Sequence, residues 1–187
     1  MTNEALDRKG LSPEPSRLHP SLEGKVRIEP IRHGGIEKHD LLADITRKPV
    51  NIGETAQFMV ERDEFSTLPE SQPYNLVIAR VDVMVPNPKG PLATTEEIDN
   101  ARDEKGLQPI PAETLLHFLL QKGDQLQMHE WIVASMKPLA ASDGNPFVFS
   151  VVRYDDGLWL VGYWAGPDGR WNPGYQFAFG LPQVNKT

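Results

Sequence analysis

A dense run of aromatic residues near the C-terminus constrains the fold more than any other feature of the sequence. Ten of the fifteen Phe, Trp and Tyr residues lie between Phe147 and Phe179. Short apolar stretches alternate there with turn residues, which is typical of paired β-strands. The run carries more ring area than one small core needs, and we therefore expect some of the rings to face a ligand.

The spacing of apolar residues predicts four strands in the C-terminal part of the chain, at residues 131–136, 147–153, 158–164 and 175–181. The sequence Tyr154-Asp-Asp-Gly157 predicts a hairpin turn, because Asp-Gly pairs supply the positive φ that such turns require. Pro167-Asp-Gly169 predicts a second turn by the same reasoning.

Two helices are expected before these strands. Thr94-Thr-Glu-Glu97 is a capping-box pattern, in which the threonine hydroxyl accepts from a free backbone amide and Glu97 reaches back. It begins a mostly charged helix over residues 95–105, with Ile98 and Ala101 facing inward. The second helix, over residues 111–122, is apolar around more than half of its circumference and is expected in the core.

The N-terminal part differs from the C-terminal part in composition and in its pattern of apolar residues. Residues 1–24 are rich in Pro, Ser, Glu and Arg without a hydrophobic period, which predicts a mobile tail. Residues 25–187 are predicted to be one domain, β-rich over residues 25–92 and helix-helix-sheet over residues 93–187. The whole pattern predicts an α+β fold, in which two helices precede the C-terminal strands of an antiparallel sheet rich in aromatic residues.

The β-rich part is expected to contain strands at residues 26–28, 56–60 and 75–85. Pro30 is expected to end the first strand. Alternation in the third strand puts the three valines between Val81 and Val85 on one face. Asp40 is expected to cap one or two helical turns over residues 40–45.

Composition excludes several classes of function. The chain has no cysteine, which excludes disulfides, thiolate-bound metals and thiol catalysis. Its net charge of −7 argues against nucleic acid as a partner, because phosphate-backbone binding draws on clustered Lys and Arg. The apolar stretches are strand-sized, so no membrane partner is expected. The first residues lack the apolar stretch of a secretory signal, and we expect a cytoplasmic protein.

No motif predicts a cofactor or a metal, and we expect none. The glycines between Gly162 and Gly174 do not follow a strand into a helix, as a phosphate-binding loop would. His33 and His39 have no third ligand of clear type nearby, so we expect two exposed loop histidines. His117 lies amid the leucines of the apolar helix and is expected to be a core histidine.

One group of residues supports an enzymatic alternative. His129 and Glu130 precede a strand, and with Asp155 or Asp156 they would form a small hydrolase-type site if the groups converged. The same aspartates, like Asp143, fit turns better than a calcium loop.

The aromatic strand over residues 158–164 is apolar on both faces, so it is either central or half-exposed as a binding face. Alternation separates Trp159 and Tyr163 from Leu158 and Leu160. Tyr, Trp and Arg are the residue types that dominate binding hot spots. The predicted ligand-binding residues are Trp159, Tyr163, Arg170, Trp171, Asn172 and Tyr175.

The last 80 or so residues resemble small bacterial proteins of uncharacterised function that end in a Trp/Asn/Asp-rich hairpin. The likeness lies in Gly106-Leu-Gln-Pro109, Ala112-Glu-Thr-Leu-Leu116, Trp131-Ile-Val-Ala-Ser-Met136, Asp143-Gly-Asn-Pro-Phe-Val-Phe-Ser150 and the stretch from Gly169 to Phe179. More remotely, this ending is similar to C-type-lectin-like folds, including retroelement-diversified variable proteins. That resemblance implies that the predicted ligand-binding residues, together with Trp164, form a ligand-facing stretch. The calcium loop and disulfides of sugar-binding lectins are absent.

These observations favour a non-catalytic recognition module that binds a protein or a small molecule through its aromatic C-terminal strands and loops. The hydrolase is the first alternative. The second is a structural or assembly protein, a homo-oligomer in which residues 1–24 form an arm exchanged between copies.

Overall fold

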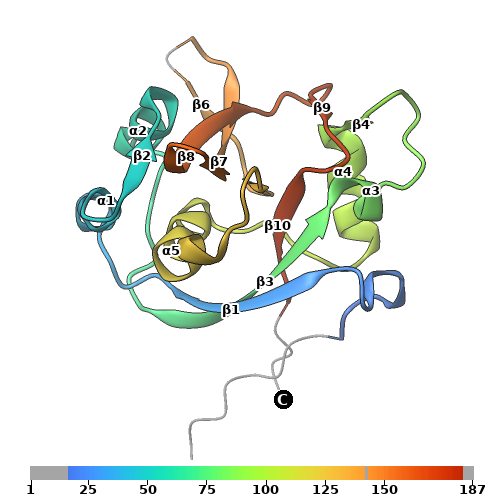
Figure 1. The fold of residues 1–187 in the computed structure, drawn as a ribbon, viewed down its shortest axis with the longest axis horizontal. Helices are drawn as coiled ribbons and strands as arrows, with labels where there is room; N and C mark the ends of the chain where they lie inside the picture. The colour runs from blue at the N-terminus through green and yellow to red at the C-terminus, as the bar shows by residue number, and fades with distance from the viewer. Residues whose placement is uncertain (1–16, 142, 183–187) are drawn as a thin grey trace, which may run out of the picture.

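A bent, mixed β-sheet is the framework of the fold (Figure 1). The computed structural model describes residues 17–141 and 143–182. The strands of the main sheet follow the order β1-β3-β10-β5-β7-β8-β2, with β6 beside β7, and β4 and β9 form a separate two-stranded ladder. The strands are β1 (Arg27–His33), β2 (Val50–Ile52), β3 (Gln72–Arg80), β4 (Ala93–Thr94), β5 (Trp131–Ala134), β6 (Leu139–Ala140), β7 (Pro146–Tyr154), β8 (Gly157–Trp164), β9 (Arg170–Trp171) and β10 (Gln176–Gly180).

The helices lie on both faces of this sheet, and the protein is α+β as predicted. They are α1 (Lys38–Thr46), α2 (Glu54–Glu61), α3 (Val81–Met84), α4 (Thr95–Glu104) and α5 (Ala112–Lys122), with short 3-10 turns η1 (Pro20–Leu22) and η2 (Gly123–Gln125). Among the described residues, none of these helices reaches the length and apolarity that crossing a membrane requires.

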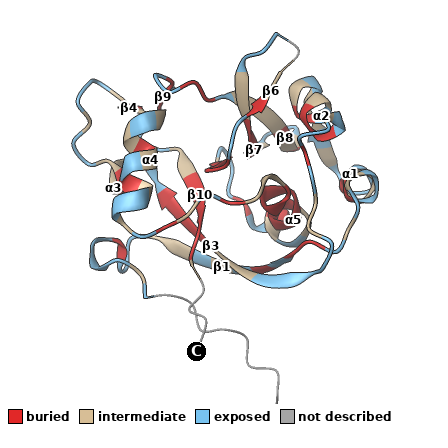
Figure 2. Cartoon of the chain, turned by 180° about the vertical axis from the view of Figure 1, so that it is seen from behind, coloured by how far each residue is buried: buried red, intermediate tan, exposed pale blue. Residues whose placement is uncertain are grey.

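α5 occupies the centre of the molecule. β1 and β3 pass on one side of it and β7 and β8 on the other, while α1 lies alongside (Figure 1). Every residue from Glu113 to Leu119 is buried, so the helix is enclosed around its circumference (Figure 2). Burying one leucine or phenylalanine side chain contributes about 1.5–3 kcal/mol, and this helix buries four of them. The inner face of the sheet, the face toward α5, is therefore the main core.

The predicted antiparallel sheet is mixed. β10 runs parallel to β5, and β2 runs parallel to β8, whereas the other pairs are antiparallel. Strands from the two halves of the sequence meet in it, because β3 pairs with β10 and β2 pairs with β8. The parallel pairs join segments that lie far apart in the chain, which local patterns do not reveal.

The helix prediction over residues 95–105 is confirmed, including its start. The Thr94 hydroxyl accepts from the Glu97 amide at 3.2 Å, and the Glu97 carboxylate accepts from the Thr94 amide at 2.9 Å. Ile98 and Ala101 are buried, as expected. The helix over residues 111–122 and the four C-terminal strands are also confirmed within a few residues at their ends.

The strand prediction at residues 56–60 is wrong, since this segment lies in α2. Ala56, Met59 and Val60 are its buried residues, and their spacing is that of a helix. α2 packs on β8 at Gly162, where an added Cβ would lie 2.5 Å from Thr55 Cγ2 and 3.0 Å from Met59 Sδ. The missing side chain of this glycine therefore lets the helix approach the sheet.

The long strand predicted over residues 75–85 ends at Arg80, and the chain then turns into α3. Val81 and Met84, one helical turn apart, are buried, so the predicted alternation of valines is wrong. β1, in contrast, continues through Pro30, which was expected to end it. Proline is tolerated there because β1 is an edge strand whose one neighbour is β3.

Two further predictions concern the N-terminal part of the chain, the Asp40 cap and the mobile tail. Glu37, not Asp40, precedes the first residue of α1, and it makes no side-chain cap. The predicted mobile tail falls mostly outside the described residues. Its last part forms η1, in which Leu22 is completely buried.

A buried polar group lies where β1 meets α5. His33, predicted to be exposed, is 1% exposed, and its Nδ1 lies 2.8 Å from the Thr114 hydroxyl. The Gly34 amide donates to His117 Nε2 at 3.1 Å, and Glu113 accepts from the Leu68 amide at 2.8 Å. His39 is exposed, as predicted, and His117 is a core histidine.

We predict that His33 makes the protein less stable in mild acid. Burial lowers the pKa of His33, opposed by Glu113 and reinforced by His117. Below pH about 6.5 the His33 imidazole therefore binds a proton in the unfolded chain but not in the native protein. The free energy of unfolding then falls by at most about 1.4 kcal/mol per pH unit until the native pKa of His33 is reached. His33→Asn should flatten this dependence, measured as the free energy of urea unfolding between pH 5 and 7.5. Exposed His39→Asn is the control, and an unchanged slope in His33→Asn would refute the assignment.

The hydrogen-bond geometry of Glu113 leads to a second prediction. Its Oε2 lies 3.4 Å from His117 Nε2, which already accepts from the Gly34 amide, and this oxygen has no hydrogen-bond donor among the described residues. Glu113→Gln keeps an oxygen that can accept from the Leu68 amide, and the free energy of unfolding should stay within about 1 kcal/mol of the parent. Glu113→Leu should cost about 2 kcal/mol or more, because it leaves the buried Leu68 amide without an acceptor. Equal losses in denaturant titrations of both variants would contradict this account.

Candidate functional site

The outer face of the sheet, turned away from α5, carries the largest group of aromatic rings. Cross-strand pairing sets which residues share it: Val152 lies between Trp131 and Trp159, and Val148 lies opposite Tyr163. Residues opposite each other in a ladder point to the same side. We call the exposed part of this group the aromatic face, formed by Trp131, Tyr154, Trp159, Tyr163 and Tyr175.

The rings of the aromatic face pack against one another. Trp131 stacks on Tyr175 at 5.0 Å between centroids, with 10° between the planes. Tyr163 meets both rings edge-on, at 5.6 Å from Trp131 and 6.2 Å from Tyr175. Tyr154 lies edge-on to Trp131 at 5.9 Å. Trp159 is held separately, since its indole N–H donates to Asp156 at 2.9 Å.

Exposure separates the rings that a partner can reach from those of the core. Tyr154 is 37% exposed, and Trp131, Trp159, Tyr163 and Tyr175 are half-buried. Burial raises the pKa of Tyr154 and of Tyr175, and the neighbouring Tyr163 adds to both shifts. The two phenols therefore keep their protons; the Tyr175 phenol is hydrogen-bonded to Tyr163, whereas the Tyr154 phenol can donate a hydrogen bond to a ligand.

Trp171, predicted to contact a ligand on the surface, is instead 1% exposed. Its indole N–H donates to the Thr95 hydroxyl at 2.9 Å, and its ring meets Phe177 edge-on and lies 4.9 Å from Tyr163. Trp171 lies in β9 and pairs with Ala93 of β4, the short strand that leads directly into α4. Trp171 is thus the inner support of the aromatic face rather than part of its surface.

The other predicted residues divide into two groups. Trp159, Tyr163 and Tyr175 belong to the aromatic face. Arg170 and Asn172 are exposed on and after β9: Arg170 lies beside Gly90, and Asn172 accepts from the Gly174 amide at 2.9 Å.

Trp164, which the resemblance placed in the same stretch, is 40% exposed and lies against Gly166 and Gly169. It falls on the same side of β8 as Leu158 and Leu160, opposite to the aromatic face.

Trp131 and Tyr154 were missed as site residues. Trp131 precedes the aromatic run by sixteen positions, and it joins the face because β5 pairs with β7. The available signal was alternation: Trp131 and Val133 share one face of a short strand, and Tyr154 sits at the start of the hairpin turn.

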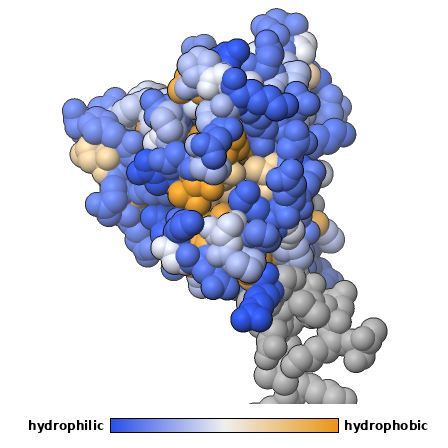
Figure 3. All heavy atoms as spheres, turned by 90° about the vertical axis from the view of Figure 1, so that its right-hand side faces the viewer, coloured by the Kyte–Doolittle hydropathy of each residue, from blue (hydrophilic) through white to orange (hydrophobic). Residues whose placement is uncertain are grey.

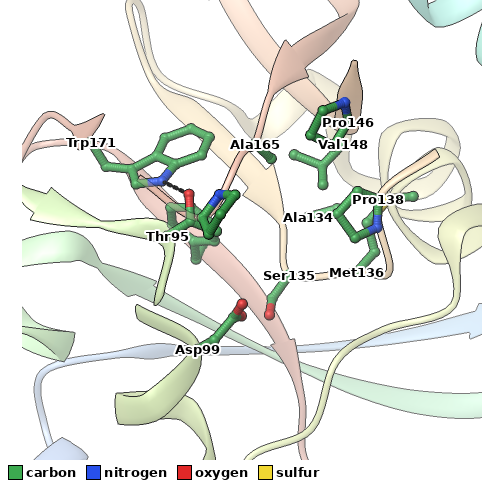
Figure 4. Close-up of a pocket in the computed structure, with 12 residues that line it drawn as sticks. Thr95, Asp99, Ala134, Ser135, Met136, Pro138, Pro146, Val148, Ala165 and Trp171 are labelled. Carbon is green, nitrogen blue, oxygen red and sulfur yellow. Dashed lines mark hydrogen bonds between the residues drawn. The ribbon is translucent and has the colours of Figure 1, made fainter. Parts of the chain in front are cut away.

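α4 borders a cavity of about 260 Å³ (Figure 4). The cavity adjoins the aromatic face, since its lining residue Trp171 packs against Tyr163. Its walls are apolar and include Trp171, Phe177, Val148 and Ala165. The carboxylate of Asp99 and the hydroxyl of Ser135 lie close together at one end of it, away from Pro146 and Val148 (Figure 4). The side of the molecule that carries α3 and α4 is mostly hydrophilic, with hydrophobic residues gathered near its centre (Figure 3).

The residues of the hydrolase alternative do not share one side of the sheet. Glu130 accepts from Arg27 at 2.9 Å, from Gln176 at 2.8 Å and from the Gln127 amide at 2.8 Å. Gln176 shares the inner face with Ile132, whereas the His129 ring contacts Tyr154 of the aromatic face. Both oxygens of Glu130 are thus occupied by structural donors.

The acidic loops act as turns. Asp143 accepts from the Asn145 amide at 3.0 Å and from its side chain at 2.7 Å, which lowers the pKa of Asp143. In the part of the chain that the structure describes, no three His, Asp or Glu side chains converge as metal ligands.

Comparisons with family models, curated proteins and solved structures found no match to this chain.

Proposed function

We propose that this protein is a non-catalytic recognition module that binds a partner protein through the aromatic face. The observation that carries the proposal is that five Trp and Tyr rings from β5, the β7–β8 hairpin and the segment before β10 are gathered on one face and remain partly exposed. These residue types dominate the binding energy of protein interfaces.

The mutual packing of the rings favours binding over a purely structural role. Rings stacked and edge-on at 5.0–5.9 Å are fixed before a partner arrives, so little conformational entropy is lost on binding. Tyr and Trp are also the side chains that recognition loops use for rigid contact area with a polar handle. Trp171 and Phe177 support the rings from behind, which adds to this rigidity.

Charge favours a protein partner over nucleic acid. Asp155 and Asp156 lie exposed at the hairpin beside the aromatic face, and the chain carries a net charge of −7. Stacking on bases is accompanied by a basic groove in single-strand binders, and acidic neighbours oppose it. A partner segment with apolar and basic residues fits this surface best.

The hydrolase remains the less favoured alternative, because both carboxylate oxygens of Glu130 accept from structural donors. The likeness to C-type-lectin-like folds, the cytoplasmic location and the exchanged N-terminal arm stay predictions. The first would be consistent with recognition through the C-terminal strands.

We predict that Tyr154→Ala and Trp159→Ala will each weaken partner binding about tenfold, since both rings are accessible and contribute like hot-spot residues. Ligands would be selected from a displayed peptide library against the parent protein, and their affinities for each variant measured by calorimetry. Trp164→Ala is the matched control, because it removes an exposed aromatic ring from the other face of β8.

Circular dichroism and thermal melting would establish that all three variants are folded. Selected peptides that bind both aromatic-face variants as tightly as the parent, or that lose affinity equally in Trp164→Ala, would contradict the assignment of this surface.

A further inference from the structure

The cavity beside α4 has the features of a preformed ligand site, separate from the aromatic face. Trp171 forms one wall, held by its hydrogen bond to Thr95 at 2.9 Å. Three prolines, Pro138, Pro146 and Pro167, line it as well, and proline side chains have little freedom to collapse inward. Small-molecule sites are typically concave, mostly apolar and formed before binding.

One end of this cavity is polar, and its hydrogen-bonding capacity is incompletely used. Arg102 Nη1 donates to Asp99 Oδ1 at 2.7 Å and to Ser135 Oγ at 3.2 Å. Among the described residues no group donates to the second carboxylate oxygen of Asp99. The Asp99 side chain is 47% exposed, so this end of the cavity opens to solvent. A ligand entering there meets a free carboxylate oxygen.

The charges around this end favour a cation. Arg102 is shared between Asp99 and Asp103, which it contacts through Nη1 at 2.7 Å and through Nε at 2.8 Å. One guanidinium between two carboxylates leaves a net charge of −1. Burial raises the pKa of Asp99, countered by Arg102 and increased by Asp103, and a bound cation would offset that cost of burial. An anionic ligand would be repelled by the same charges.

The size and walls of the cavity define the rest of the ligand. At about 260 Å³ it lies just below the range of roughly 300–1,000 Å³ that holds drug-sized molecules. A single ring or a branched aliphatic group would contact Trp171, Phe177 and Val148, with a short arm directed toward Asp99.

We propose that this cavity binds a small primary amine with a compact apolar or aromatic body, whose ammonium group donates to Asp99 and whose body packs against Trp171 and Phe177. The site does not depend on partner binding by the aromatic face. The Asp99 carboxylate alone distinguishes this amine from neutral or acidic molecules of the same shape.

The test uses benzylammonium, benzyl alcohol and benzoate as probes of one shape and three charges. Binding to the full chain would be followed by amide chemical shifts in NMR titrations. Benzylammonium should shift the resonances of Asp99, Ser135 and Ala165, benzyl alcohol should bind about tenfold more weakly, and benzoate should not bind. Equal binding of all three probes, or shifts confined to other parts of the protein, would overturn the proposal.

Two aspartates of α4 provide a matched pair of variants. Asp99→Asn keeps the shape of the cavity but removes its charge, and should weaken benzylammonium binding about tenfold. Asp103→Asn removes the same charge from a carboxylate that is 65% exposed and does not line the cavity, and should weaken binding much less than Asp99→Asn does. Ala165→Leu fills the apolar end and should abolish binding of benzylammonium and benzyl alcohol. Full binding by Asp99→Asn, or unimpaired binding by Ala165→Leu, would refute the site.

Discussion

The packing of α5 inside the bent sheet is the interaction on which the rest of the structure depends. The helix is buried from Glu113 to Leu119, so it needs partners on several sides at once. The sheet supplies them by bending around it, with β1 and β3 on one side and β7 and β8 on the other. This arrangement explains why the N-terminal strands pair with β10 and β8, since they complete the enclosure of an apolar helix that a smaller sheet would leave exposed.

The same packing decides what lies on the outer face. Once Leu158 and Leu160 of β8 are committed to the core, alternation turns Trp159 and Tyr163 outward, and pairing with β7 and β5 adds Trp131. The outer rings then cover part of one another's surface, and the rest of their surface stays accessible to solvent. Beside them α4 and the β4–β9 ladder cover the sheet incompletely, which leaves the cavity lined by Asp99. Both proposed sites are therefore consequences of one packing arrangement.

Local signals predicted those elements whose partners are close in sequence. The Thr94 and Glu97 pair predicted both the start of α4 and its hydrogen bonds, because a capping box closes within one helical turn. Residues 56–60 were misassigned, because a short apolar run fits a strand and a buried helix equally well. Two of the five residues of the aromatic face, Trp159 and Tyr163, followed from alternation in β8. Trp171 did not, because its burial depends on β4, a strand that precedes it by almost eighty residues.

The sequence alone determined the α+β class, the core helix α5 and the alternating faces of the aromatic strands, since each of these depends on the periodicity of neighbouring residues. The tertiary structure alone decided which face of β8 meets water, which tryptophan is buried, and that His33 lies in the core. Those outcomes depend on contacts between residues far apart in the chain. A side chain's position on a strand is set by the backbone period, but its exposure is set by what the rest of the chain places against it.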